Sequence, residues 1–185
     1  MLDAVESGDA KMLAELIRQD PGFKVNTDLG YGATLLHRAC EDDRRSPMIP
    51  LLLAHPDIDI NAKNVHGYTP FLYACGGRPS CVREMLKDSR LKVNDPSNDG
   101  WTPLYCAAYH GHLDLIKVWI ASGREMDLGK SGDVDKTDAI GVAKEEKKTE
   151  VVSLLERFKS DAAKTRSEVR KELGITGHYY LIFLH

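Results

Sequence analysis

The sequence lacks an excess of positive charge and a long apolar run. Lys and Arg total 25 against 28 Asp and Glu, which leaves a formal net charge of −3. This balance argues against a nucleic-acid-binding domain, which needs a basic surface. No stretch approaches the roughly 18 apolar residues of a membrane span, and residues 1–13 carry acids where a secretory signal has basic residues. We therefore expect a soluble, cytoplasmic protein that binds neither nucleic acid nor membrane, with a nuclear location left open.

Cysteine and phosphate-binding loops are also scarce. The four cysteines form no C-x-x-C motif and lie among Ala, Leu and Tyr, which is typical of small buried thiols. The one Gly-rich stretch, "GGRPS", follows an expected helix and has no Lys-Ser/Thr ending, so it is no phosphate loop. No serine or cysteine has a base fixed beside it. We predict that the chain is not an enzyme and has no catalytic residues, cofactor or metal.

One stretch nevertheless resembles a metal site. "YHGHLD", residues 109–114, is similar to the H-x-H-x-D ligand run of zinc hydrolases with the metallo-β-lactamase fold. That run continues with another histidine, whereas this chain has Leu115. A zinc-dependent hydrolase using His110, His112 and Asp114 is kept as an alternative, and it would need distant ligands from a tail that carries the only later histidines.

Self-similar segments recur along the chain at a nearly constant spacing. Three are closely alike: "GATLLHRAC" from Gly32, "GYTPFLYAC" from Gly67 and "GWTPLYCAA" from Gly100, at steps of 35 and 33 residues. A weaker copy, "KTDAIGVAK", starts at Lys136. A second marker, an apolar residue followed by Asn or Asp, begins at Val25 and repeats in phase with the first. Two markers in phase indicate a repeat protein.

Each copy has the features of a helix pair. Thr34, Thr69 and Thr102 precede apolar stretches, as helix N-caps do, and Pro70 and Pro103 follow directly, where a missing N–H costs nothing. The later part of each copy carries apolar residues at i, i+3 and i+4, the period of a half-buried helix. The apolar face of this second helix needs the next copy to cover it.

The pattern resembles the ankyrin repeat, whose signature is a Gly-x-Thr-Pro-Leu-His first helix, a Gly-His turn and an apolar-Asn finger. The resemblance covers roughly residues 2–159. It implies an all-α solenoid of stacked helix-turn-helix repeats with β-turn fingers. It also implies that His37 forms hydrogen bonds between neighbouring repeats, that Gly111 and His112 form a turn, and that Trp119 lies in the core.

The resemblance divides the chain into seven segments. These are an N-terminal capping helix pair that is a partial repeat (1–26), three ankyrin repeats (27–61, 62–94 and 95–127), a degenerate C-terminal repeat (128–160), a C-terminal helix (161–174) and an apolar tail (175–185).

The sequence departs from the family pattern in two repeats. In the first full repeat "EDDRRSP" replaces the Gly-His turn, so we expect Ser46 and Pro47 to cap a second helix in which Pro50 costs a hydrogen bond. In the last repeat Asp138 takes the threonine position, where it can still cap a helix, and the finger is longer.

The segment that follows the repeats reads as one more helix. Thr165 and Glu168 have capping-box spacing, and Gly174 is expected to end the helix. The apolar tail beyond it is β-prone. Three alternatives stay open for this tail: it packs back on the repeats, pairs with another molecule, or is buried by a continuation of the chain.

The resemblance implies a protein-binding face made of finger tips and first helices. The family's variable positions, carried over one by one, give the candidate partner-binding residues Tyr31, Glu41, Asp42, His66, Tyr68, Asn98, Asp99, Trp101, Tyr109 and His110. Four of these are aromatic, and Tyr and Trp tend to dominate interface energetics. We therefore expect a non-catalytic interaction module or scaffold for a protein or peptide, with basic residues in the ligand favoured by the acids. The alternative function is an assembly domain that self-associates through its tail.

Overall fold

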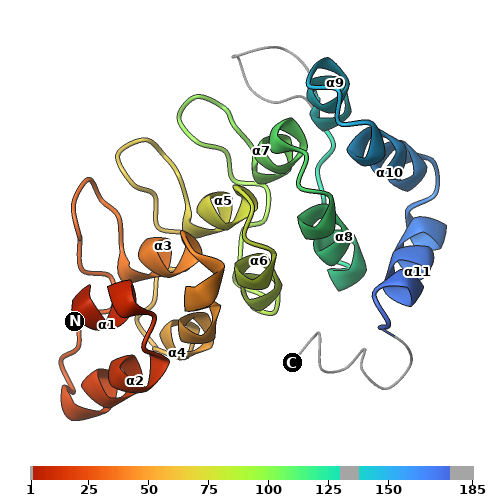
Figure 1. The fold of residues 1–185 in the computed structure, drawn as a ribbon. Helices are drawn as coiled ribbons and strands as arrows, with labels where there is room; N and C mark the ends of the chain where they lie inside the picture. Colours follow the sequence, from red (N-terminus) through yellow and green to blue (C-terminus); the bar gives the residue numbers. More distant parts are fainter. Residues whose placement is uncertain (1, 130–137, 176–185) are drawn as a thin grey trace.

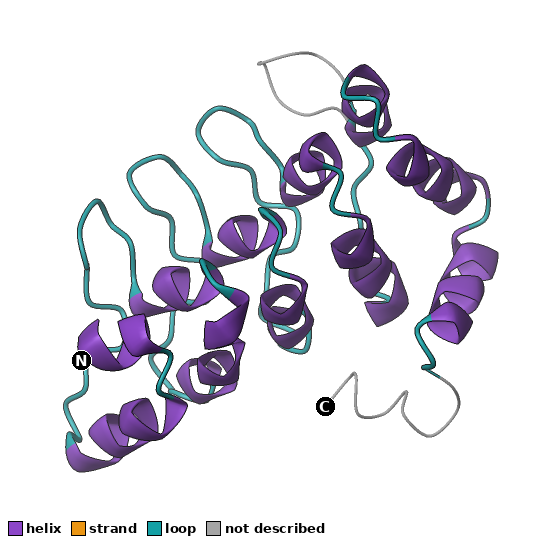
Figure 2. Ribbon diagram, viewed as in Figure 1, coloured by secondary structure: helices purple, strands orange, loops and turns teal. Residues whose placement is uncertain are grey.

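The computed structural model describes residues 2–129 and 138–175, and in them every regular element is a helix (Figures 1 and 2). The elements in chain order are α1 (Leu2–Ser7), α2 (Ala10–Gln19), α3 (Leu35–Cys40), the 3₁₀ helix η1 (Asp43–Met48), α4 (Ile49–Leu53), α5 (Pro70–Cys75), α6 (Pro79–Met85), α7 (Pro103–His110), α8 (Leu113–Ser122), α9 (Ala139–Glu145), α10 (Thr149–Ser160) and α11 (Ala162–Glu172). No helix in these ranges is both long and apolar enough to cross a lipid bilayer.

The helices form two rows. The first helices of the repeats, α1, α3, α5, α7 and α9, contact one another in order, and the second helices α2, α4, α6 and α8 form a parallel row behind them. Long loops connect one pair to the next and project to the same side as fingers (Figure 2). This arrangement confirms the predicted all-α solenoid, and each helix pair lies within its predicted segment.

The helix starts follow the predicted cap chemistry. The hydroxyl of Thr69 accepts a hydrogen bond from the Leu72 N–H at 3.1 Å, and that of Thr102 accepts one from the Tyr105 N–H at 3.2 Å. Asp138 caps α9 in the same way. A side-chain acceptor here satisfies one of the donors that a helix start leaves unpaired.

His37 joins two neighbouring repeats from a fully buried position. Its Nδ1 accepts the Thr34 backbone N–H at 3.0 Å, so the ring proton lies on Nε2, which donates to the Tyr68 carbonyl at 3.0 Å. Burial lowers the pKa of the imidazole. The predicted bond between repeats is confirmed, and the neutral ring is the form that both contacts need.

The core is one continuous apolar layer between the two rows of helices. Trp119 is completely buried, packs edge-on against the Phe71 ring of the preceding repeat, and donates its indole N–H to the Glu125 carbonyl. The expectation that Trp119 belongs to the core is therefore confirmed. All four cysteines are buried free thiols, as predicted.

The second helix of the first full repeat differs from the expectation. The chain forms the 3₁₀ helix η1 and then the five-residue α4, and Asp42, not Ser46, caps the start. Pro47 lies inside η1 and Pro50 in the first turn of α4. Because proline lacks an N–H, a continuous α-helix across both positions would lose hydrogen bonds, and the chain divides there.

The C-terminal helix α11 begins earlier than its capping-box spacing predicted. Asp161 is the cap and accepts the Lys164 N–H at 2.9 Å, whereas Thr165 is buried inside the helix. The Asp161 carboxylate, one turn before Thr165, caps the helix instead, and Thr165 lies on the buried side of α11. Gly174, with φ +70°, ends the helix region as predicted.

Helix α11 closes the row of second helices. It contacts α8 more extensively than α10 does (Figure 1). Arg166 donates to the Ile120 carbonyl and Arg170 to the Ala121 carbonyl, both in the last turn of α8. The longer finger and the apolar tail that the sequence suggested fall largely at 130–137 and 176–185, outside the described residues.

We predict that acid destabilises the fold through His37. The unfolded chain takes up a proton near the usual histidine pKa of about 6.5, whereas the lowered pKa keeps the folded ring neutral. Stability is therefore full above that pH and is lost as pH falls through it. His37→Ala should cost roughly 2 kcal/mol near neutral pH, for two buried hydrogen bonds, and should flatten the pH dependence of the unfolding free energy measured in urea.

His66→Ala is the control for this experiment, because His66 is exposed. It should leave both the stability and its pH dependence close to wild type. A pH dependence in His37→Ala as steep as that of wild type would contradict the assignment.

A second prediction concerns α11. Replacing Arg166 and Arg170 by Ala removes two hydrogen bonds to α8 carbonyls, and should lower the free energy of unfolding by about 2 kcal/mol. Replacing the exposed Lys164 and Lys171 of the same helix by Ala removes the same charge without those bonds. Equal urea midpoints for the two double variants would show that α11 does not close the array.

Candidate functional site

The fingers hold the predicted finger residues through backbone pairing. Within each finger the chain folds back on itself, as between the Asn64 N–H and the Tyr68 carbonyl. Neighbouring fingers are then tied tip to tip, because the Val65 N–H donates to the Tyr31 carbonyl and the Asn98 N–H to the His66 carbonyl. Side chains at equivalent positions of successive fingers therefore lie next to each other.

Aromatic rings touch one another along the third full repeat. The Trp101 ring centroid lies 5.1 Å from that of Tyr105 and 5.3 Å from that of Tyr109. The Tyr109 ring meets His110 at 5.0 Å. Tyr105 is buried beneath, Trp101 and Tyr109 are half-buried, and His110 is exposed. We call Trp101, Tyr109 and His110 the aromatic strip, and it is rigid because each ring rests on another.

A second aromatic group lies on the preceding repeat. The Tyr68 ring packs at 5.8 Å from Tyr73, which in turn meets His37 edge-on at 5.6 Å. Partial burial raises the pKa of the Tyr68 phenol, and the Asp99 carboxylate of the next finger adds to that shift. Tyr68 therefore faces the finger that carries Trp101, and its hydroxyl stays protonated at neutral pH.

Tyr31 is the most exposed of the predicted aromatics. Its side chain is 80% accessible, and its φ of +56° is one that glycine usually adopts. The carboxylate of Asp28 fixes the tip by accepting the N–H groups of both Gly30 and Gly32. Val65, the neighbour on the next tip, is also exposed. This pair forms an apolar point at the N-terminal end of the face.

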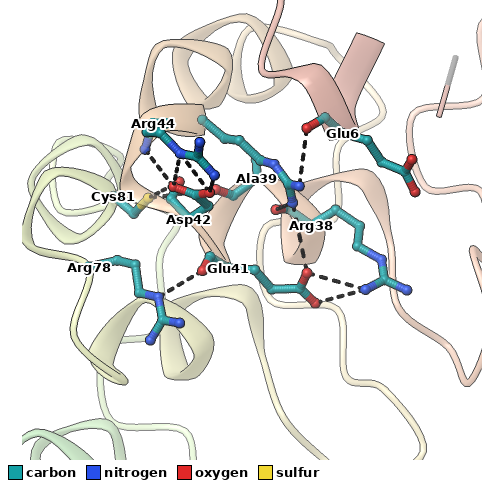
Figure 3. Close-up of polar contacts among 9 residues, drawn as sticks. Glu6, Arg38, Ala39, Glu41, Asp42, Arg44, Arg78 and Cys81 are labelled. Atoms are coloured by element: carbon teal, nitrogen blue, oxygen red, sulfur yellow. Dashed lines mark hydrogen bonds and ion pairs between the residues drawn. The ribbon is translucent and has the colours of Figure 1, made fainter. Parts of the chain in front are cut away.

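Glu41 and Asp42 are already occupied by arginines (Figure 3). Arg38 lies 3.1 Å from the Glu41 carboxylate, and Arg45 lies 3.9 Å from it. Arg44 binds Asp42 and lowers the pKa of that carboxyl to about 2. Two of the three acids expected to attract a basic ligand are therefore paired within the chain. The third, Asp99, is exposed on the finger of the third full repeat.

Asn98 has a structural task. Its side-chain amide donates to the Val65 carbonyl at 3.0 Å, and its backbone N–H donates to His66. His66 itself is exposed beside it. Of the residues expected to bind a partner, Asn98 is thus engaged in holding two finger tips together, whereas His66 is exposed.

The histidines of "YHGHLD" lie together but serve the turn. The His110 and His112 rings are 5.5 Å apart, and the His112 ring forms a hydrogen bond with the Gly76 backbone of the preceding repeat. Asp114 lies in the first turn of α8, where its charge suits the helix dipole. In the described ranges no group of three or more His, Cys, Asp or Glu side chains is placed to hold a metal ion.

The buried thiols show no sign of activation. Desolvation raises the pKa of Cys81 to about 12 and that of Cys106 to about 11. A reactive cysteine needs the opposite shift, since the thiolate is the nucleophile. The thiols act as small apolar groups in the stack.

The sequence reasoning did not identify three residues that support the candidate site. Tyr105 underlies Trp101, Tyr73 underlies Tyr68, and Arg78 links two repeats by donating from Nε to the Glu41 carbonyl at 2.7 Å. Tyr105 stands four residues after Trp101 and Tyr73 five residues after Tyr68, and the recurrence of a tyrosine at a similar spacing in both repeats could have marked them. Nothing in the sequence marks the contact of Arg78, which spans 37 positions.

A family model described as ankyrin repeats, in three copies, matches residues 1–95, 41–138 and 76–166. Human SMC5-SMC6 complex localization factor protein 1 is 40% identical over 93 residues, which are 50% of this chain and 9% of that protein. Alpha-latrotoxin-Lg1a of Latrodectus geometricus is 28% identical over 83% of this chain and 11% of the toxin.

A putative ankyrin repeat protein of Rickettsia bellii is 29% identical over 64% of each chain. The chain thus spans only about a tenth of the first relatives and less than two thirds of the last. Their similarity concerns the repeat array.

The finger pairing yields a prediction for Gly67. A Cβ at this position would lie 2.6 Å from the Asn98 backbone nitrogen, and φ is +74°. Gly67→Ala should therefore lower the free energy of unfolding by roughly 2 kcal/mol or more, by pushing apart the tips. Gly174→Ala is the matched control, with φ +70° and open space around it. If both variants lower the free energy of unfolding by the same amount, the fingers do not approach each other as closely at Gly67 as the structure shows.

Proposed function

This chain belongs to the ankyrin repeat family, and on that premise we propose that it binds a protein or peptide partner through the aromatic strip and the neighbouring Tyr68. Ankyrin arrays are in general interaction modules without catalytic groups, and their stacked repeats offer an extended binding surface. The observation that carries the proposal is the run of ring contacts from Tyr105 through Trp101 and Tyr109 to His110.

The rings in the strip suit a binding role because they are ordered before the partner arrives. Trp101 and Tyr109 each rest on another ring and keep part of their surface exposed. A partner therefore gains apolar contact without freezing a mobile side chain, which is one of the entropic costs of forming an interface. Such pre-ordered aromatic anchors carry most of the energy in many interfaces.

The charge of the face supports one further detail of the partner. Asp99 is exposed beside Trp101, while Glu41 and Asp42 are held by arginines. We propose that a basic residue of the partner lies near Asp99. This charge pair would orient the partner and raise the association rate more than it would raise the affinity. Tyr31, His66 and Val65 would then contact the same partner at the finger tips.

The cellular location belongs to the same proposal. The acidic net charge and the buried free thiols suit a reducing compartment. We propose the cytoplasm, with the nucleus as the second candidate, and a scaffold role that depends on the partner. Proteins captured in each compartment would decide between the two locations.

The proposal predicts that Trp101→Ala combined with Tyr68→Ala weakens partner capture by about tenfold or more, as expected for loss of two aromatic anchors. The two rings also support Tyr105 and Tyr73, so a loss of about 1 kcal/mol in stability is expected. The measurement is capture from lysate by the immobilised full chain, followed by an affinity measurement with the protein identified.

Met12→Ala serves as the control, because Met12 is an exposed apolar residue on α2, away from the fingers. Circular dichroism must show that the double variant is folded at the temperature of the assay. A captured protein that binds the folded double variant as tightly as wild type would refute this site.

A further inference from the structure

Four nitrogen-bearing side chains gather where the first helices end. Arg78 follows α5, His110 and His112 flank the turn after α7, and Lys148 caps α10. We call these four residues the turn cluster. His110, Arg78 and Lys148 all act electrostatically on His112, and each lowers its pKa, after burial as the largest cause. The contacts agree with this, because the His110 and His112 rings are 5.5 Å apart, Arg78 and His112 both bond to the Gly76 backbone, and the Lys148 side chain lies beside Gly111.

Arg78 is held in place by carbonyl groups and not by a carboxylate. Its Nε donates to the Glu41 carbonyl at 2.7 Å (Figure 3). Its Nη1 donates to the Gly76 carbonyl. The Glu41 carboxylate points to Arg38 and Arg45 instead. The guanidinium thus keeps its full charge and has N–H donors left over, because it carries five.

The turn glycines let the other members approach closely. A Cβ at Gly77 would lie 2.7 Å from the His112 ring, and a Cβ at Gly111 would lie 2.7 Å from the Lys148 side chain. Gly76 and Gly77 thus leave the room that Arg78 and His112 occupy. Tyr109 and His110 occupy the equivalent positions of the next repeat.

No carboxylate in the described ranges forms an ion pair with any of the four members. Two acids face the same region: Asp114 in the first turn of α8 and Glu150 in that of α10, which line a cavity with Gly77 and His112. Both lie near helix starts, whose dipoles favour their charge. Arg78 and Lys148 are therefore cations without a direct ion-pair partner in the described ranges, in a region that also carries two acids.

From this geometry we infer that the turn cluster binds an anionic oxygen group, a phosphate or a carboxylate, carried by a protein partner. Arg78 supplies fixed N–H donors, Lys148 a point charge, and the histidines N–H donors that gain charge in acid. The site touches the aromatic strip through His110. It does not depend on the function proposed for the strip, because a free anion can occupy it.

Affinity for the anion should rise as pH falls. A bound anion stabilises the protonated imidazole of His112, so anion and proton binding favour each other. The change should occur across the histidine range, near and below about pH 6.5. Asp114 and Glu150 face the same region and oppose anion binding.

The test uses the full chain with inorganic phosphate and, separately, acetate at constant ionic strength. Histidine ring C–H resonances are followed by NMR at about pH 6 and about pH 8. We expect saturable shifts of His110 and His112 and tighter binding at the lower pH. His110→Ala combined with Lys148→Ala, which spares the carbonyl contacts of Arg78 and His112, should weaken binding by about tenfold.

Lys11→Ala provides the control, since Lys11 is exposed on α2 at the far end of the array and loses the same kind of charge. Binding of phosphate alone would support a phosphorylated partner, and binding of both anions would support an acidic one. Absence of saturable binding, or equal weakening in Lys11→Ala and the double variant, would overturn the site. Neither result bears on the Trp101 and Tyr68 variants.

Discussion

The solenoid depends on the capture of helix-end carbonyls by side chains of the next repeat. Each short helix leaves its last carbonyls without partners, and they lie where water reaches only in part. Arg45 reaches the carbonyl of Glu6 and Arg78 that of Glu41, while Arg124 binds the carbonyls of Asp88 and Leu91 in the loop after α6. Apolar contact alone would let neighbouring repeats slide, since it has no direction. These directed bonds set the register on which the fingers and the aromatic strip depend.

Much of the architecture could be predicted because short sequence motifs determine the helix starts, turns and core positions of an ankyrin repeat. The threonine caps, the turn at Gly111 and the burial of Trp119 each follow from a few adjacent residues and the repeat period. The division of the second helix into η1 and α4 was not predicted, although Pro50 was recognised as a position that costs a hydrogen bond. The missing N–H of proline explains why the helix divides, whereas packing against the neighbouring repeat determines the conformation of the two parts.

The site was harder to predict, since its properties come from distant partners. Variable positions indicated which side chains reach the face, but not that Arg44 and Arg38 neutralise Asp42 and Glu41. Nor could the sequence show that Asn98 ties finger tips or that Trp101 rests on Tyr105. The charge and mobility of a surface residue depend on neighbours that a single repeat does not contain. The repeat pattern therefore indicated which residues lie on the face, but not which of them are ion-paired or held by other side chains.

The position of α11 also bears on how the array can change in length. This helix fills the place beside α8 and binds the carbonyls at the end of that helix through Arg166 and Arg170. A repeat duplicated at the C-terminal end would have to displace it, whereas one inserted between α3 and α8 would meet two ordinary neighbours. In an array where each unit contacts only the next, an added repeat is therefore accommodated more easily in the interior than between α8 and α11.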